Sequence, residues 1–547
     1  MSGIEFVGLS FAVIDQLVKI GDKTIAIISD AKDFEADSSK LYTRTRIELN
    51  RTKQLKNLLF TSISGREDSN DTPFGRFDIN TQAEIMGMFE QLEGTLSQAH
   101  RLLWGRYGDA VPDSSPTPST SSSSTHPSTT RHVSASDGSS PSPSHQLSVP
   151  SLKRSSSTSI LAKAKWALRD KKQAAQLLND FNDLNVRILD QTKLLLFAST
   201  LGRELEYCTL LQENSSARAL GFDADARLRI MAVDEESAMG IENLELPPST
   251  VNFPSPGLPG SNTGVSICQI DSQNLAFEFK SLTAGAGNQK VVRQRTRQLA
   301  ALLNQEKNPS FRVLQCRGYT YLASRNQFAF LYNLPDGSEP KPVSLLDELR
   351  NRNSKPSLGD RFRLALVLAS SISQLHMVQW VHKSFRSQKI IFFPNKQDAI
   401  EYDKPWVFGF EYSRPAIDFT MGQVEDIEND IYRHPDRQGQ PSQSFTKIHD
   451  IYALGVVLLE IGLWQPAVEL ERGGFATVTD PRGIQKQLQK HASKRLRDKV
   501  GEKYTNIVLK CLAGDFNVPN DTKDDLKLQM LFRESVISVL EKAAQSV

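Results

Sequence analysis

A long run of serine, threonine and proline interrupts the first half of this chain of 547 residues. It extends from about Val111 to Ser159 and includes the stretch SSPTPSTSSSSTHPSTT. A segment with so few apolar side chains cannot bury enough surface to offset the entropy lost on ordering, so we predict that it is disordered. Hydrophobic residues make up 39% of the chain, and those that form a core must lie on either side of this insert.

Apolar residues before and after the insert recur at intervals of three and four, which indicates amphipathic helices. The recurring positions are Ile4, Val7, Phe11, Ile14 and Val18, then Ile85, Met88, Leu92, Leu96, Ala99 and Leu103, and after the insert Phe181, Leu184, Ile188 and Leu195. Thr81 and Glu84 have the spacing of a capping box at the start of the second of these helices. We therefore predict an all-α helical bundle over residues 1–222, divided by the insert at about 111–159.

A second change in composition lies near residues 246–264, where proline and glycine are concentrated. Its glycines could be read as a phosphate-binding loop, but prolines lie between them and no predicted strand precedes them, so we interpret residues 223–262 as a linker. Beyond it, strand patterns occur in VSICQI, LAFEFKSL, FRVLQC and FAFLYNL, with a helix predicted over 291–304 and further helices after them. Strands followed by helices predict a sheet-containing lobe and a helical lobe over residues 263–547.

Charge and cysteine content exclude several classes of function. Lysine and arginine total 65 against 63 acidic residues, a net charge of +2, so we expect no nucleic-acid partner. The four cysteines are far apart and form neither a metal-binding nor a disulfide pattern, which is typical of a reducing compartment. The first residues lack the features of a signal peptide, and charged residues interrupt their apolar stretch too often for a spanning helix. We therefore expect a soluble, cytoplasmic protein.

Four short motifs follow one another in the C-terminal half. They are HKSFRSQK at 382–389, VFGFEYSR at 407–414, YRHPD at 432–436 and HDIYALGVVLLEIG at 449–462. In this order and spacing they resemble the catalytic loop, the D-F-G motif, the A-P-E segment and the buried helix of protein kinases. The resemblance covers residues 263–547 and implies an α+β bilobal, protein-kinase-like fold. It also implies that Asp450 holds the backbone of the catalytic loop.

In the same alignment, the residues that phosphoryl transfer requires are absent. Within the loop that begins with His382 and Lys383, Ser384 stands at the position of the catalytic base. Lys389 stands at the position of the metal-binding Asn, where its charge would repel a metal ion. Gly409 takes the place of the metal-binding Asp and is followed by Phe410 and Glu411. Glu411 is the one carboxylate there that could restore metal binding, the alternative being a role at the surface.

Lys280 is the candidate for the lysine that contacts nucleotide phosphates. The alternative is that it pairs with an acid elsewhere in its lobe. The helix predicted after it offers arginine and glutamine but no glutamate, and no glycine lies between Val265 and Leu282 to form a phosphate-covering loop. We therefore predict a pseudokinase with no catalytic residue, no metal and no cofactor.

The N-terminal helical patterns have a family likeness as well. The segments GIEFVGLSFAVIDQLVKIGDKTIAII, INTQAEIMGMFEQLEGTLSQAHRLL and WALRDKKQAAQLLNDFNDLNVRILDQT resemble the HeLo domain of fungal heterokaryon-incompatibility and prion-inhibition proteins. The resemblance covers residues 1–222 with their insert. It implies a helical bundle whose N-terminal apolar segment can be released to disturb membranes and cause programmed cell death.

The N-terminal stripe of Ile4, Val7, Phe11, Ile14 and Val18 is the candidate for membrane contact. We expect it to be buried in the folded bundle and, once displaced, to form an amphipathic segment suited to an anionic bilayer surface. The alternative is an ordinary core helix. A basic cluster at Lys153–Lys172 is a second candidate for lipid contact, against the alternative of a solvated helix face.

Together, these features predict a fungal-type signalling or cell-death effector. A catalytically defective kinase-like domain would bind protein partners and regulate a helical bundle that engages the plasma membrane, with homo-oligomers forming on activation. Phosphorylation of the Ser-Pro-rich insert would change its charge. One alternative is a protein-interaction scaffold with no membrane step, and a second is an atypical protein kinase.

Overall fold

The computed structural model describes residues 3–30, 36–63, 71–107, 171–233, 243–254, 264–281, 289–410, 414–415, 427–438, 444–471, 475, 480–516, 518–519, 521–522 and 525–547. The predicted disordered insert at about 111–159 lies outside these residues. The chain divides into two compact units. The first consists of Met1–Lys56 and Ala83–Ile188, and the second of Asn57–Gln82 and Leu189–Val547.

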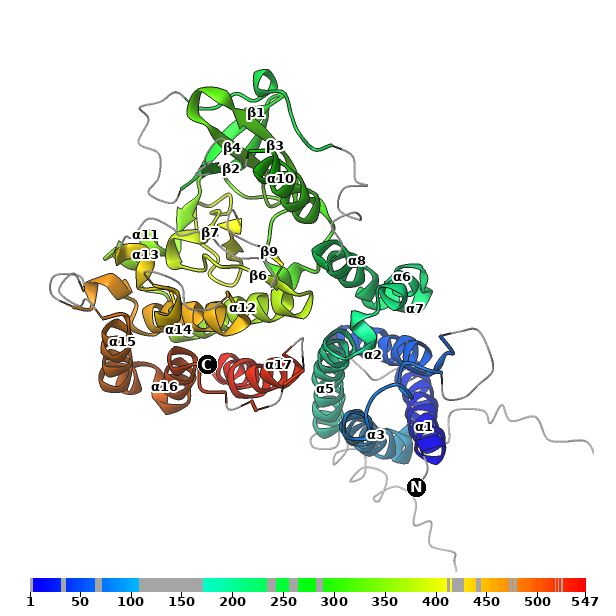
Figure 1. Cartoon of the computed structure of the whole chain (residues 1–547). Coiled ribbons are helices and arrows are strands. Elements are labelled where there is room, and N and C mark those ends of the chain that lie inside the picture. Colours follow the sequence, from blue (N-terminus) through cyan, green and yellow to red (C-terminus); the bar gives the residue numbers. More distant parts are fainter. Residues whose placement is uncertain are drawn as a thin grey trace, which may run out of the picture. The chain divides into compact units, whose positions relative to one another are not determined.

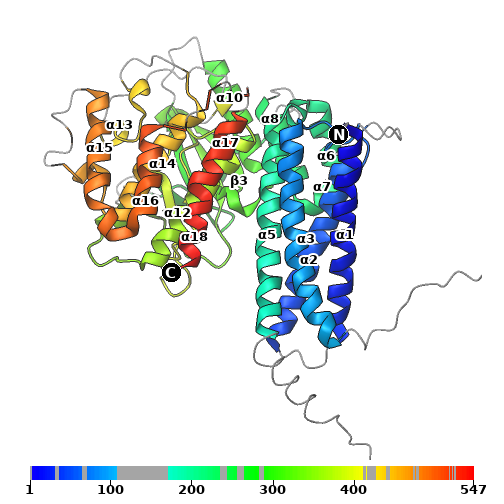
Figure 2. The same cartoon turned by 90° about the horizontal axis from the view of Figure 1, so that it is seen from below.

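The first unit is a bundle of helices that lie side by side (Figure 2). Its helices are α1 (Gly3–Asp30), α2 (Ala36–Phe60), α3 (Ile79–Tyr107) and α5 (Lys171–Ala198), the last three of which continue into the second unit. The predicted apolar repeats supply much of the core, since Ile14, Ile85, Leu92, Phe181 and Ile188 are fully buried. The prediction of a helical N-terminal region is therefore confirmed.

The start of α3 differs from the prediction. The Asp78 carboxylate accepts the backbone N–H of Asn80 and of Thr81 at 3.0 and 3.1 Å, and the Thr81 hydroxyl at 2.6 Å. These contacts satisfy the free amides of the first turn, so the helix begins at Ile79. The predicted capping box of Thr81 and Glu84 is wrong, because Asp78 already supplies the acceptor one turn earlier.

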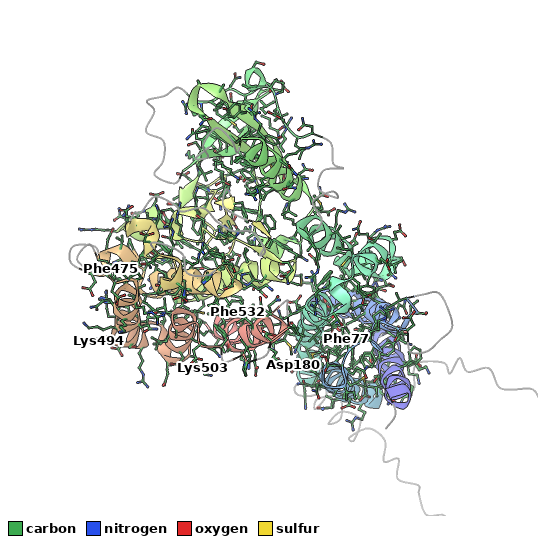
Figure 3. The ribbon with its side chains drawn as sticks, in the orientation of Figure 1. Phe77, Asp180, Phe475, Lys494, Lys503 and Phe532 are labelled. Atoms are coloured by element: carbon green, nitrogen blue, oxygen red, sulfur yellow. The ribbon has the colours of Figure 1, made fainter. Side chains whose placement is uncertain are left out.

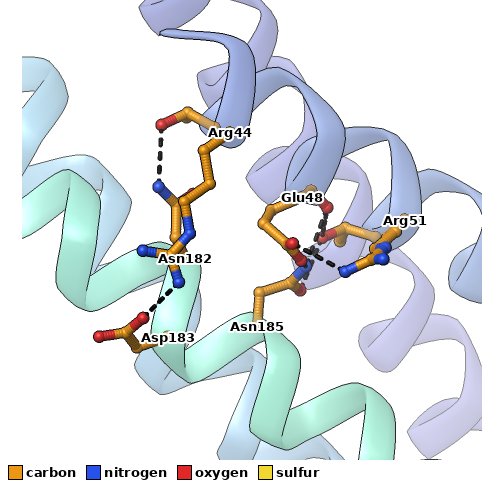
Figure 4. A network of polar contacts seen from close by, with 8 residues as sticks. Arg44, Glu48, Arg51, Asn182, Asp183 and Asn185 are labelled. Atoms are coloured by element: carbon orange, nitrogen blue, oxygen red, sulfur yellow. Dashed lines mark hydrogen bonds and ion pairs between the residues drawn. The ribbon is translucent and has the colours of Figure 1, made fainter. Parts of the chain in front are cut away.

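A line of polar side chains runs through the core between α2 and α5 (Figure 4), and we call it the polar seam. It consists of Thr45, Glu48, Thr52, Asn182 and Asn185, all of which are buried. Asn185 donates to the Glu48 carboxylate at 3.0 Å and accepts from the Thr52 hydroxyl at 2.8 Å, while Asn182 donates to the Thr45 hydroxyl at 3.2 Å. The spacing of three and four residues places the members of each helix on one face.

The second unit begins with a group of helices and then forms a four-stranded antiparallel sheet (Figure 1). The helices are α6 (Leu205–Glu213), α7 (Ser215–Leu220) and α8 (Phe222–Val233). The strands are β1 (Val265–Ile270), β2 (Gln273–Ser281), β3 (Cys316–Leu322) and β4 (Gln327–Asn333), in the spatial order β1-β2-β4-β3, and α10 (Gln289–Asn304) lies between β2 and β3 in the chain.

The segment predicted as a linker at 223–262 is largely ordered in its described parts. Residues 222–233 form α8, in which Asp225 pairs with Lys193 and Arg229 donates to the Met377 carbonyl at 2.9 Å. Further on, Val251 and Phe253 pack in the apolar cluster on one face of the sheet, where the Phe253 ring lies 5.0 Å from that of Phe277. The linker prediction is wrong here because the apolar residues among the prolines cover the sheet.

The strand predicted at FRVLQC is also displaced. Phe311 ends a 3-10 turn at Pro309–Phe311, and Arg312 has a left-handed backbone with φ of 54°. That conformation interrupts an extended strand, so β3 begins at Cys316 and continues to Leu322.

Short strands and long helices complete the second unit. The strands are β5 (Val343–Ser344), β6 (Trp380–Val381), β7 (Ile390–Phe392), β8 (Trp406–Val407) and β9 (Arg414–Pro415). The helices are α11 (Leu345–Arg350), α12 (Leu358–Met377), α13 (Ile427–Asp430), α14 (Lys447–Leu463), α15 (Pro481–Arg495), α16 (Arg497–Ala513), α17 (Leu526–Phe532), a π-helical turn at Arg533–Ile537 and α18 (Ser538–Gln545). The C-terminal half thus contains antiparallel sheets and helices. Among the described helices, none combines the length and apolarity needed to cross a bilayer.

Candidate functional site

The candidate site is centred on a buried glutamate in the middle of β2. Side chains of a strand alternate between its two faces, so Ala276, Glu278 and Lys280 share one face of β2 while Phe277 and Phe279 share the other. The second face belongs to the apolar cluster that contains Val251. Glu278 is therefore directed to the opposite side, where only 1% of its side chain is exposed.

The Glu278 carboxylate is held by three donors. Oε2 accepts the backbone N–H of Gly409 at 2.9 Å and lies 3.4 Å from Lys389 Nζ, while Oε1 accepts the Tyr332 hydroxyl at 2.8 Å. A carboxylate removed from water is stable only when its charge and its lone pairs are satisfied, and these contacts do both. They join Glu278 to three residues that are each more than 50 positions away from it in the sequence.

Gly409 and Lys389 also constrain each other sterically. Gly409 has φ of 92°, and a Cβ atom at this position would lie 2.9 Å from Lys389 Cγ and 3.2 Å from Lys389 Cδ. An aspartate at position 409 would need both a strained backbone and a displaced lysine. The packing around position 409 therefore favours glycine.

The loop at His382–Lys383 is fixed by the buried carboxylate of Asp450. Asp450 Oδ2 accepts the backbone N–H of His382 at 2.7 Å, and Oδ1 accepts that of Lys383 at 2.9 Å. His376 Nε2 lies 3.2 Å from Oδ2. Burial disfavours ionisation of Asp450, but the hydrogen bond and charge of His376 and the amide of His382 hold its pKa below the ordinary value. Asp450 thus holds the backbone of this loop through two hydrogen bonds.

His382 connects this loop to the strand that leads to Gly409. Its Nδ1 accepts the backbone N–H of Ser384 at 3.2 Å, so Nε2 carries the proton and donates to the Phe408 carbonyl at 2.9 Å. The ring also lies edge-on to Phe410, with centroids 4.6 Å apart. A fixed His382 therefore keeps the two loops in one arrangement.

The other predicted site residues are Lys280 and Glu411. Lys280 is half-buried in β2, opposite Phe328 of β4, and takes no part in the contacts given above for Glu278. Glu411 lies outside the described residues. Among those that are described, no group of three or more His, Cys, Asp or Glu side chains could hold a metal ion.

Sequence reasoning missed Glu278. The available signal was an acid within the otherwise apolar run LAFEF, because an ionised side chain in a buried strand needs a partner. The partner, Lys389, follows 111 residues later and cannot be identified from local pattern alone.

The N-terminal stripe is only partly buried, which corrects the expectation for the folded bundle. Ile14 is fully buried and Val18 is half-buried, but 44% of Phe11 is exposed, and Lys56 Nζ lies 4.1 Å from the centre of its ring. The side chains of Ile4 and Val7 lie outside the described residues. The face of α1 that packs into the bundle instead carries Ser10, Ile14, Leu17, Gly21 and Thr24.

Comparison with known proteins identifies the N-terminal region. Residues 6–192 match the HeLo family model, described as prion-inhibition and propagation, which confirms this part of the prediction. Residues 293–547 match the model of a domain of unknown function, DUF7580. No curated protein matches the chain. The kinase-like interpretation of the C-terminal region stays a prediction.

Proposed function

We propose that this chain is a signalling effector of the cell-death or incompatibility type. An N-terminal HeLo bundle would engage anionic membranes, and a C-terminal kinase-like domain without catalytic activity would regulate it and bind protein partners. The HeLo match supports the signalling role. Cytoplasmic residence, recruitment to the plasma membrane and oligomerisation on activation are parts of the same proposal.

The order of elements supports a kinase-like domain. A four-stranded antiparallel sheet with a helix between its second and third strands comes first, and α12, the HKS loop and the buried helix α14 follow. The two backbone hydrogen bonds to Asp450 then fix the HKS loop to the start of α14.

The contact between Glu278 and Lys389 carries the proposal that this domain is inactive. Lys389 and Gly409 stand where the kinase resemblance expects metal-binding residues, and the Lys389 ammonium and the Gly409 amide already bind a carboxylate of the protein itself. A magnesium nucleotide would have to compete with this buried carboxylate, and its own negative charge would be repelled by Glu278 at short range.

A thermal-shift titration of the full chain with ATP, with and without magnesium, tests this inactivity. We expect no magnesium-dependent stabilisation, because ligand binding would raise the midpoint by mass action. In Glu278→Gln the competing charge is gone, so any response to ATP should increase without magnesium. Magnesium-dependent stabilisation of the wild type that disappears in Lys280→Ala would instead support the atypical-kinase alternative.

The exposed ring of Phe11 supports membrane contact by the N-terminal helix, since an apolar side chain that is already accessible can enter a bilayer interface without unfolding the bundle. Dye release from phosphatidylserine-containing vesicles by the full chain tests this step. Phe11→Glu should abolish release. Ile47→Glu is the matched control, because Ile47 of α2 is similarly exposed at 47% but lies outside the stripe.

The same vesicle experiment separates the two main alternatives. Equal dye release by the wild type and Phe11→Glu would show that the N-terminal stripe is not needed for membrane disruption. No vesicle binding under any condition would favour the protein-interaction scaffold.

A further inference from the structure

A row of exposed cations runs along α15 in the C-terminal region. Its members are four residues apart in the sequence: Arg482, Lys486, Lys490 and Lys494. The buried side chains of the same helix recur at the same interval, at Ile484, Leu488 and Ala492. Because positions four apart share one side of a helix and positions two apart lie on nearly opposite sides, the cations form a single row directed to solvent.

The next helix extends this row into a surface. α16 adds three exposed cations, Arg497, Lys499 and Lys503, and we call the seven together the basic face. Figure 3 shows Lys494 on α15 and Lys503 on α16 along the same edge of the C-terminal region. Residues 481–513 contain nine lysines and arginines against two acids, whereas the whole chain has 65 against 63. Positive charge is therefore concentrated on these two helices.

Most of the basic face has no counter-charge among the described residues. Arg482 lies 3.6 Å from Asp436, and Arg497 lies 3.0 Å from Glu502. The five lysines form no ion pair there, and the one side-chain contact among them joins Lys490 Nζ to the neutral Gln487 amide oxygen at 3.5 Å. The charge of these lysines is therefore available to an external partner.

The stability of α15 does not explain the row. Like charges four residues apart repel each other and destabilise a helix. The helix dipole favours a cation in the last turn, which accounts for Lys494, but Lys486 and Lys490 lie in the middle of the helix. A negatively charged partner would remove the repulsion, so the row indicates a binding surface.

The composition of the basic face favours a lipid surface over a protein partner. Protein interfaces depend on aromatic or aliphatic anchors and are poor in lysine. On α15 and α16, all of whose residues are described, no large apolar side chain is exposed. A lysine ammonium is also a point charge without the fixed fork with which arginine recognises a single carboxylate or phosphate. Lysines spread over two helices suit the many mobile headgroups of an anionic bilayer.

We infer that the basic face docks the C-terminal region onto an anionic lipid bilayer. The attraction is electrostatic and acts at the level of the headgroups, because the face offers no apolar side chain for insertion. The inference rests on the proposed membrane recruitment and deepens it, since it adds a contact surface outside the HeLo bundle. Docking by this face does not require Phe11.

The test is co-sedimentation of the full chain with phosphatidylcholine vesicles that contain or lack phosphatidylserine. Phe11→Glu serves as the parent, so that contact through the N-terminal stripe does not mask the effect. The parent should bind only the vesicles with phosphatidylserine, and high salt should release it by screening. Adding Lys486→Gln, Lys490→Gln and Lys494→Gln should weaken binding about a hundredfold, because each lysine near an anionic surface contributes about a factor of five.

The matched control removes the same charge from exposed cations elsewhere in the C-terminal region, through Arg352→Gln, Lys355→Gln and Lys396→Gln. Its vesicle binding should equal that of the parent. Lys499→Gln with Lys503→Gln provides an independent variant on α16 and should weaken binding about twenty-five-fold. Thermal midpoints show whether each variant is folded.

Equal vesicle binding by the parent and both lysine variants would overturn this inference and leave the role of the bundle untouched. Binding of wild type without dye release would count against the proposed function alone. A polyglutamate peptide that binds more tightly than the vesicles, and that the lysine variants no longer bind, would identify an acidic protein segment as the partner and also overturn the inference.

Discussion

The HeLo bundle and the C-terminal region both contain buried carboxylates, but they satisfy them differently. In the bundle, the Glu48 carboxylate accepts from side chains, those of Asn185 and Arg51 at 3.0 and 2.8 Å. In the C-terminal region, the carboxylates of Asp450 and Glu278 accept backbone N–H groups of distant loops. The first kind of contact joins the faces of regular helices, whereas the second determines the path of the chain.

Because of this difference, we expect the two regions to respond differently when a buried polar contact is removed. Helices with complete backbone hydrogen bonding can separate or repack when side-chain contacts between them are replaced. Loops whose amides are bound by a buried acid lose their conformation when that acid is removed. The comparison therefore predicts that the helical bundle rearranges more easily than the C-terminal region, and the following variants test it.

Removal of the Asp450 charge should have the largest effect. In Asp450→Asn an amide NH₂ would face a backbone N–H, and one of the two loop contacts would be lost within a fully buried environment. We expect a loss of about 3–5 kcal/mol in the free energy of unfolding, measured by urea denaturation. Asp398→Asn alters an exposed ion pair with Lys341, and its free energy of unfolding should equal that of the wild type. Equal free energies of unfolding for the two variants would contradict the proposed rigidity of the C-terminal region.

Glu460 is a third buried carboxylate of the C-terminal region, and it should make stability depend on pH. It accepts the Ala467 amide and the Tyr432 hydroxyl, at 2.8 and 2.7 Å, and burial raises its pKa to about 7. Between its ordinary pKa of 4.5 and about 7, the folded state binds the proton that the unfolded state has lost. Stability from this group is thus present below pH 4.5 and lost as pH rises.

Glu460→Gln mimics the protonated acid and should remove that pH dependence. Relative to the variant, the wild type should lose on the order of 3 kcal/mol between acid and neutral pH. Parallel stability curves for the two proteins from pH 4.5 to 8 would show that Glu460 is ionised in the fold.

Replacement of Glu278 should have a smaller cost. Glu278→Gln keeps an acceptor for the Gly409 amide but removes the negative charge beside Lys389, so we expect a loss of about 1–3 kcal/mol in the free energy of unfolding, measured by urea denaturation. The charge swap Glu278→Lys with Lys389→Glu should not recover the wild-type value, since Gly409 and Tyr332 would then donate toward a lysine. Full recovery would mean that the ion pair alone, and not the amide contact, determines stability.

The polar seam should give the smallest effect and the opposite sign. Asn182 Oδ1 is buried without a hydrogen-bond partner among the described residues, and its amide makes one contact of 3.2 Å with Thr45. The double variant Thr45→Val, Asn182→Leu replaces both partners by apolar groups and should change unfolding by less than about 1 kcal/mol, toward greater stability. A clear loss of stability would show that the seam holds the bundle as firmly as Asp450 holds its loop.

The sequence predicted the helices well because the three- and four-residue repeat is a property of each segment alone. It did not predict which face of α1 is buried. That face contains Gly21, where a Cβ atom would lie 2.4 Å from Leu49 Cδ1, and the buried Thr24, whose hydroxyl lies 3.0 Å from His100 Nδ1. The orientation of α1 is decided by the close approach of Gly21 to α2 and by the contact of Thr24 with a polar side chain of α3. The three- and four-residue apolar repeat indicates neither contact.

The sequence predicted only part of the candidate site. The part that it missed depends, like the orientation of α1, on contacts between distant segments. The positions of Lys389, Gly409 and Asp450 follow from short motifs in a recognisable order. Glu278 acquires its role only when β2 pairs with β4 and brings Tyr332 beside it, so its importance depends on sheet register. Lys280, which the kinase resemblance singled out, lies on the same face of β2 but nearer the end of the strand, where it is half-buried, whereas Glu278 lies at the buried centre.

The central proposal is that the C-terminal region is catalytically inactive, with Lys389 and the Gly409 amide bound to the buried Glu278 carboxylate. Phosphate release and autophosphorylation by the full chain, with saturating ATP and magnesium, test it most directly. The account predicts that both rates equal those of a sample without protein and that Lys280→Ala changes neither. Magnesium-dependent turnover above that background, abolished by Lys280→Ala, would contradict it.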